Sequence, residues 1–158
     1  KKIISRDDLD LYATDNEGRT AFHAACKGGN VKTVKFLITQ DYLDINRKDI
    51  YEMTALHSAC FEGHFEIVKL LLSRDDMDIK AKDYEGKTAL YRGYQGKLSR
   101  EDLIRLGAQI CSSFKLHPSE LLEEEQEGES KSEEEKATLE AIISQISSVL
   151  SQRKSARN

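Results

Sequence analysis

Long apolar segments are missing from this sequence. Hydrophobic residues make up 39% of its 158 residues, but no stretch approaches the roughly 20 consecutive apolar residues of a membrane-spanning helix. We therefore expect no association with a membrane. A charged fraction of 33% suits one globular domain with a polar appendage.

Cysteine is also scarce. The three cysteines, Cys26, Cys60 and Cys111, cannot form an even disulfide framework. Buried, reduced thiols are the default for such a chain, which favours a cytoplasmic or nuclear location. Cys26 and Cys60 are separated by 34 residues, the spacing of the repeat described below. We therefore interpret them as small packing residues rather than a redox pair.

An excess of basic charge is absent from the body of the chain. Residues 1–110 contain 18 Lys and Arg and 18 Asp and Glu, so the net charge of −4 comes from the remainder. A neutral body is not typical of a nucleic-acid-binding domain. The sequence also lacks a glycine-rich phosphate loop and a pair of carboxylates at a fixed spacing. We predict no enzyme activity, no metal, no other cofactor and no nucleic-acid partner.

The sequence does repeat itself, at a period of 34 residues. Residues 15–21 return in closely similar form at 83–89, with a related version at 49–55. In the first two units a short segment of small residues ends at glycine, and a second segment carries apolar residues at three-to-four spacing. These units are expected to form a helix, a tight turn, a second helix and an extended loop. Stacked units of this kind bury their apolar faces against their neighbours.

These units resemble the ankyrin repeat. Thr20-Ala21-Phe22-His23 and Thr54-Ala55-Leu56-His57 match the family pattern Gly-x-Thr-Pro-Leu-His, with alanine at the proline position. The resemblance implies L-shaped units whose first helices and hairpin tips line a concave groove. We predict an all-α fold, an ankyrin-type helical repeat solenoid with a C-terminal amphipathic helix.

The expected domain boundaries follow from the period. The repeats occupy 1–110, as a partial unit at 1–13, two units at 14–47 and 48–81, and a degraded capping unit at 82–110. An acidic linker at 111–131 and an amphipathic helix at 132–155 complete the chain. Because the first residues align with the end of a second helix, we expect further repeats upstream.

Two further residues depart from the repeat pattern. Glu52 replaces the glycine of the other two hairpins, so we expect strain in that turn. Tyr91 replaces the histidine of the third unit, and the second helix of that unit, near Arg100 to Leu106, is expected to end at Gly107.

The histidines and cysteines of the first helices invite a zinc hypothesis. His23 and Cys26 are three residues apart, as are His57 and Cys60. Stacked helix axes lie about 8–10 Å apart, whereas zinc ligands must converge within about 2.0–2.3 Å of one ion. The resemblance instead implies that each histidine bonds to the nearby threonine and ties one hairpin to the next. A thiol protease is disfavoured because buried cysteines resist ionisation.

The candidate partner site uses positions that the family leaves free. Ile50, Tyr51, Met53 and Phe61 are apolar where the scaffold does not require it, which is typical of an interface core. The alternative is that the tail or a loop covers them. Three lysines are expected to steer an acidic segment of the partner. The predicted partner-binding residues are Lys48, Ile50, Tyr51, Met53, Phe61, Lys82, Tyr84 and Lys87. The implied function is a scaffold that binds another protein or peptide segment through the groove.

The tail begins with an acidic run and ends in a predicted helix. Residues 132–135 fit a capping box. The apolar stripe that follows is Leu139, Ile142, Ile143, Ile146, Val149 and Leu150. This stripe could dock on the last repeat, pair with another chain or begin a further domain. The alternative function is therefore an autoregulatory or oligomerisation module of a larger protein, with self-association through residues 139–150.

Overall fold

The computed structural model describes residues 10–122 and 131–158, and the structural statements below refer to these residues. In chain order the elements are α1 (Ala21–Gly28), α2 (Val31–Leu37), α3 (Ala55–Glu62), α4 (Phe65–Leu72), α5 (Ala89–Gln95), α6 (Arg100–Phe114), the 3-10 helix η2 (Pro118–Leu121) and α7 (Glu133–Ala156). The only strand-like pairing in the described ranges is a bridge between Lys82 and Thr88. The predicted all-α repeat solenoid with a C-terminal helix is confirmed.

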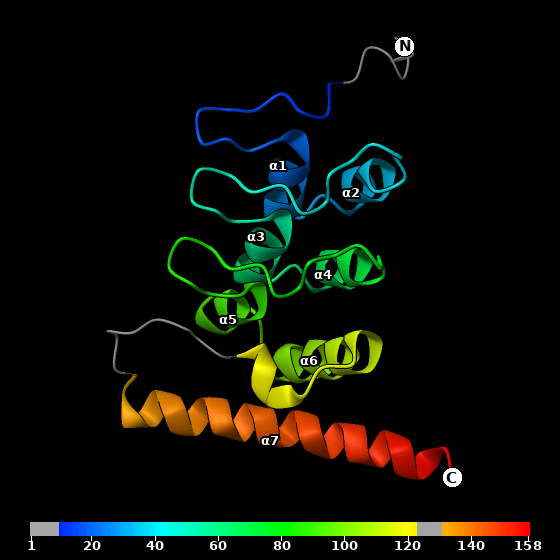
Figure 1. The fold of residues 1–158 in the computed structure, drawn as a ribbon, viewed down its shortest axis with the longest axis vertical. Coiled ribbons are helices and arrows are strands. Elements are labelled where there is room, and N and C mark those ends of the chain that lie inside the picture. The colour runs from blue at the N-terminus through cyan, green and yellow to red at the C-terminus, as the bar shows by residue number, and fades with distance from the viewer. Residues whose placement is uncertain (1–9, 123–130) are drawn as a thin grey trace.

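The helices form two columns (Figure 1). Helices α1, α3 and α5 make one column, α2, α4 and α6 make the other, and the loops between units project from the first column. The predicted boundaries stay predictions. Most of the partial unit at 1–13 and the acidic run at 123–129 lie outside the described residues.

Local sequence explains where the first helices begin. Thr20, Thr54 and Thr88 each precede a helix in extended backbone, and each hydroxyl accepts a hydrogen bond from the backbone N–H three residues later. Such a bond satisfies one of the N–H groups that have no partner within the helix.

Gly63 ends α3 for two reasons. Its φ of 77° is the left-handed conformation that glycine adopts at low cost. A Cβ at this position would also lie 2.8 Å from the carbonyl oxygen of Lys97, which lies between α5 and α6 in the next unit. The glycine therefore ends the helix and lets the next unit approach.

The core is a column of repeated positions between the two layers of helices. Cys26 and Cys60, and Val34 and Val68, are all buried. Burial raises the pKa of both thiols to about 12. The thiols thus stay protonated at neutral pH, which agrees with their interpretation as packing residues.

Helix α6 is longer than the sequence predicted. It continues through Gly107 to Phe114, so the expected end at Gly107 is wrong. A Cβ at Gly107 would lie 2.5 Å from Cδ1 of Ile146 in α7. This glycine therefore makes room for a neighbouring helix. Lys115, with φ of 54°, ends α6 instead.

Helix α7 lies across the last repeat (Figure 1). Leu139, Ile142 and Ile146 are buried in this contact. At the start of α7, Tyr91 Oη donates a hydrogen bond to Glu135 Oε1 at 2.6 Å. Of the three destinations that the sequence left open for this helix, docking on the last repeat is the one observed.

Candidate functional site

A repeated hydrogen-bond pattern shapes the hairpins. Asp15, Asp49 and Asp83 hold equivalent positions, and Oδ1 of each accepts bonds of 2.9–3.0 Å from the backbone N–H groups two and four residues later. Neighbouring hairpins are linked directly, because the N–H of Tyr84 donates to the carbonyl of Tyr51 at 3.1 Å. The tips therefore form one continuous row, on the side where the loops project in Figure 1.

The strain expected at Glu52 is present. Its φ is 56°, whereas Gly18 and Gly86 adopt 71° and 73° at the equivalent positions. A non-glycine residue in this conformation costs free energy. The second hairpin therefore keeps the geometry of its neighbours despite the substitution.

A groove of about 320 Å³ lies between the hairpin row and the first helices. Its lining consists of Glu17, Arg19, Lys27, Asp49, Tyr51, Met53, Ser58, Phe61, Glu62, Tyr84, Glu85 and Arg92. The rings of Tyr51 and Tyr84 are tilted against each other with centroids 6.2 Å apart. Tyr51 is 42% exposed and Tyr84 is 57% exposed. Phe61, near the end of α3, is 39% exposed. The groove thus brings together four of the predicted residues, Tyr51, Met53, Phe61 and Tyr84.

The other predicted residues are not in this lining. Ile50 is exposed and approaches Gly18 of the preceding hairpin. Lys48 Nζ donates a hydrogen bond of 2.7 Å to the carbonyl of Lys82. Lys87 is buried, with Nζ 3.0 Å from Glu85 Oε2 and 5.8 Å from the centre of the Tyr91 ring. The expectation that Lys87 steers a partner is therefore corrected, because its ammonium group is enclosed and paired.

Ion pairs largely neutralise the groove walls. Arg19 contacts the carboxylates of Asp15 and Glu17, both at 2.9 Å. Arg92 contacts Asp83 at 2.5 Å and Glu85 at 3.1 Å. These pairs place both signs of charge around the aromatic side chains.

Glu85 is held in its ionised form. Hydrogen bonds from Tyr84, which has the larger effect, and from Lys87 lower the pKa of Glu85 to about 2. The carboxylate therefore stays charged throughout the physiological range, and it fixes the Tyr84 hydroxyl through a 2.7 Å bond.

Some residues of the groove were not among the predicted ones. Ser58 of α3 and Arg92 of α5 line it, and Ala24 of α1 holds the same repeat position. The available signal was the change from alanine to serine to arginine along three aligned units. A polar residue at that position marks the face that the stack leaves open.

The two histidines take the structural role that the resemblance implied. His23 Nδ1 lies 2.9 Å from Thr20 Oγ1, and its Nε2 lies 2.8 Å from the carbonyl oxygen of Arg47. His57 repeats this arrangement with Thr54 and the carbonyl of Lys87. Both ring nitrogens of each histidine are engaged, which leaves none for a zinc ion. Burial also lowers the pKa of both imidazoles.

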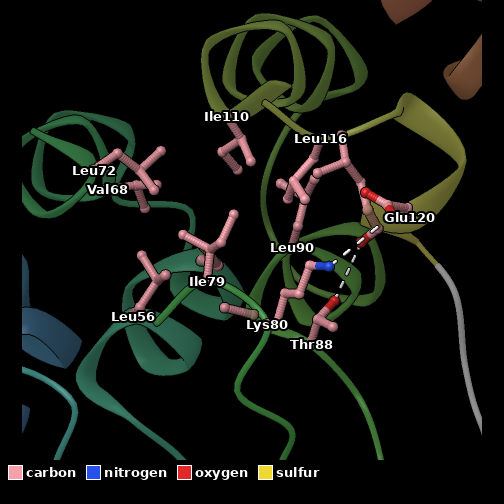
Figure 2. A pocket seen from close by; sticks show the side chains of 13 residues that line it. Leu56, Val68, Leu72, Ile79, Lys80, Thr88, Leu90, Ile110, Leu116 and Glu120 are labelled. Carbon is pink, nitrogen blue, oxygen red and sulfur yellow. Dashed lines mark hydrogen bonds and ion pairs between the residues drawn. The ribbon is translucent and has the colours of Figure 1, made fainter. Parts of the chain in front are cut away.

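The rest of the described ranges offers no second site of obvious chemistry. No group of three or more His, Cys, Asp or Glu side chains there is arranged to hold a metal. No described helix combines the length and apolar character needed to cross a bilayer. A small cavity of about 20 Å³ is lined mainly by apolar residues, together with Thr88 and the Lys80–Glu120 ion pair. These side chains are drawn in Figure 2. Such a cavity has room for about one water molecule, so we regard it as a packing gap.

The family model described as "Ankyrin repeats (3 copies)" matches residues 1–83 and 44–99. No curated protein matches the sequence. The matched residues cover more than half of the chain and include the hairpins, the capping threonines and the helices α1 to α5. The chain belongs to the ankyrin repeat family.

Proposed function

We propose that this chain binds a partner protein through its concave groove, by enclosing a bulky apolar side chain of an extended segment. Ankyrin repeats are generally protein–protein interaction modules, and members of the family are typically non-enzymatic scaffolds. The observation that carries the proposal is the grouping of Tyr51, Phe61 and Tyr84, which come from two hairpins and one helix. They are three of the six exposed large hydrophobic residues in the described part of the chain.

The chemistry of the groove suits an apolar anchor with polar flanks. Aromatic side chains dominate the centres of protein interfaces because they bury much surface at a small entropic cost. Arg19 and Arg92 are already paired with carboxylates of the groove. An acidic segment would have to displace those carboxylates, so we propose a segment of mixed or neutral charge.

The alternative function, an autoregulatory or oligomerisation module, has less support. It would use the apolar stripe of α7, and Leu139, Ile142 and Ile146 of that stripe are buried against the last repeat. Self-association through these three residues would therefore require α7 to leave its site. The cytoplasmic or nuclear location stays a prediction, supported by three free and buried cysteines.

The test compares two matched double variants. Tyr51→Ala/Phe61→Ala removes a tyrosine and a phenylalanine from the groove. Tyr12→Ala/Phe36→Ala removes the same pair of residue types from exposed positions outside the groove lining. Partners captured by the parent protein from a cell extract would be identified and purified, and their affinities measured by calorimetry.

We expect the groove variant to lose about 2 kcal/mol or more of binding free energy, equivalent to roughly 30-fold in affinity. The control variant should bind within about twofold of the parent. Equal binding by all three proteins, each shown to be folded by circular dichroism, would refute the groove as the binding site.

A further inference from the structure

We propose a second interaction surface, at the C-terminal end of α7, that binds an acidic protein segment carrying a bulky apolar residue. It lies in a hollow of about 450 Å³ between the end of α6, the start of η2 and the last turns of α7. This volume falls within the range of about 300–1,000 Å³ typical of ligand sites. None of the residues that line it belongs to the concave groove.

The floor of the hollow is apolar. It consists of Cys111, Leu116, Pro118 and Leu150. Cys111 and Pro118 are buried, whereas Leu116 and Leu150 remain partly exposed after α7 has docked. The docking of α7 therefore leaves apolar surface that an inserted side chain could cover.

The charged side chains at the rim of the hollow are all positive. Arg153, Lys154 and Arg157 line it from the end of α7, together with His117 from the loop before η2. No acidic residue lines the hollow. None of the three cations forms an ion pair with any residue in the described ranges, in contrast to the arginines of the groove.

The helix end does not account for all of this positive charge. A helix C-terminus is equivalent to roughly half a negative charge, whereas α7 ends with three exposed full positive charges. The excess is concentrated at one end of the molecule, since α7 begins with Glu133, Glu134 and Glu135. In Figure 1 this end of α7 extends past α6. A complementary partner therefore supplies carboxylates to the rim and an apolar side chain to the floor.

The same features argue against single-stranded nucleic acid and against an anionic membrane as the ligand. Single-stranded nucleic acid is bound by a basic groove with aromatic side chains for stacking, and no aromatic side chain lines this hollow. Anionic membranes bind helices that present a continuous apolar face to the lipid, and here the apolar surface is the floor of a recess. A protein segment fits both the recess and the charges.

The proposal can be tested with the full chain and a fluorescent 12-residue peptide that repeats the sequence Glu-Asp-Leu-Phe. Fluorescence anisotropy would give its affinity for the parent protein, for Arg153→Gln/Lys154→Gln and for the control Lys32→Gln/Lys35→Gln. The control removes the same charge from two exposed positions on α2. Two further peptides would replace either the acids by amides or the apolar residues by serine.

We expect Arg153→Gln/Lys154→Gln to weaken binding at least about fivefold, as the loss of two rim contacts implies. Both altered peptides should also bind more weakly. The control variant and Tyr51→Ala/Phe61→Ala should bind like the parent, which separates this surface from the groove.

Several results would overturn the proposal. These are no saturable binding up to about 1 mM peptide, equal binding by Arg153→Gln/Lys154→Gln, or equal binding of the amide peptide. Binding of phosphatidylserine vesicles or oligouridylate that depends on the two cations, without binding of the acidic peptide, would assign the hollow to a membrane or to RNA instead.

Discussion

At the scale of single residues, two buried histidines join the units of the stack. Each imidazole bonds to the threonine that caps its own helix and to a carbonyl of the next hairpin, so His57 links α3 to the residues just before α5. In the third unit Tyr91 replaces histidine and bonds to Glu135 of α7 instead. The substitution changes the partner of this position from another repeat to the terminal helix.

These histidines should make the stability of the fold depend on pH. Burial lowers the folded-state pKa of His23 and His57 below their unfolded value of about 6.5. Below that pH the unfolded chain binds more protons than the folded one, so the free energy of unfolding should fall as pH decreases from 7.5 to 5. The slope should reach at most about 1.4 kcal/mol per pH unit for each histidine. Urea unfolding at several pH values measures it.

A variant and a control separate this effect from general destabilisation. His57→Gln should be less stable than the parent at pH 7.5 but should show a shallower decline toward pH 5. Ile67→Val, at a fully buried position, should lose about 0.5–1.5 kcal/mol and keep the full slope. A parent stability that does not change between pH 7.5 and 5 would contradict the assignment.

At the scale of elements, local signals predicted the repeat helices well. Threonine caps and glycine ends mark α1 and α3 within a few residues, and apolar residues at helical spacing mark α2 and α4, so these four helices could be anticipated from the sequence. The end of α6 could not be anticipated, because a glycine such as Gly107 can have either of two structural roles. A glycine can stop a helix, or it can admit a side chain from elsewhere, and only the position of Ile146 decides between them.

The docking of α7 was also only partly predictable. An apolar stripe on a helix shows that it must be buried, but it does not name the surface that buries it. That surface is formed by α6 and η2 together, and both Ile146 of α7 and Leu121 of η2 lie close to Gly107. The complementary shape arises from residues that carry no recognisable signal in the sequence.

Two glycine-to-alanine substitutions should therefore have opposite effects. A Cβ at Gly28 would meet nothing within 4 Å, whereas one at Gly107 would overlap Ile146. Gly28→Ala should stabilise the protein by up to about 1 kcal/mol through helix propensity. Gly107→Ala should destabilise it by about 1 kcal/mol, because overpacking outweighs the same gain. Chemical unfolding measures both.

The contact with Ile146 supplies an internal control for this prediction. If Cδ1 of Ile146 is the obstacle, Ile146→Val should remove it, and Gly107→Ala should cost less in that background than in the parent. Strict additivity of the two substitutions would show that they do not interact in the way the packing implies.

At the scale of the whole molecule, the stack brings distant residues onto one surface. Tyr51 and Tyr84 are one repeat apart in the sequence, and their rings lie 6.2 Å apart because the hairpins align. The repeat period and the resemblance to the ankyrin repeat together predicted that Tyr51, Met53, Phe61 and Tyr84 share a groove. It could not predict that Lys87 turns inward, because that depends on its pairing with Glu85 and its position over Tyr91.

The central claim, that a partner occupies the groove, can be tested directly by site-specific photo-cross-linking in cells. A benzophenone amino acid would replace Tyr84 in one protein and Phe36, exposed on α2 outside the groove lining, in another. We predict a discrete cross-linked partner from position 84 and none from position 36, and Tyr51→Ala/Phe61→Ala should abolish the product. Cross-linking of the same partner from position 36 but not from position 84 would contradict the account.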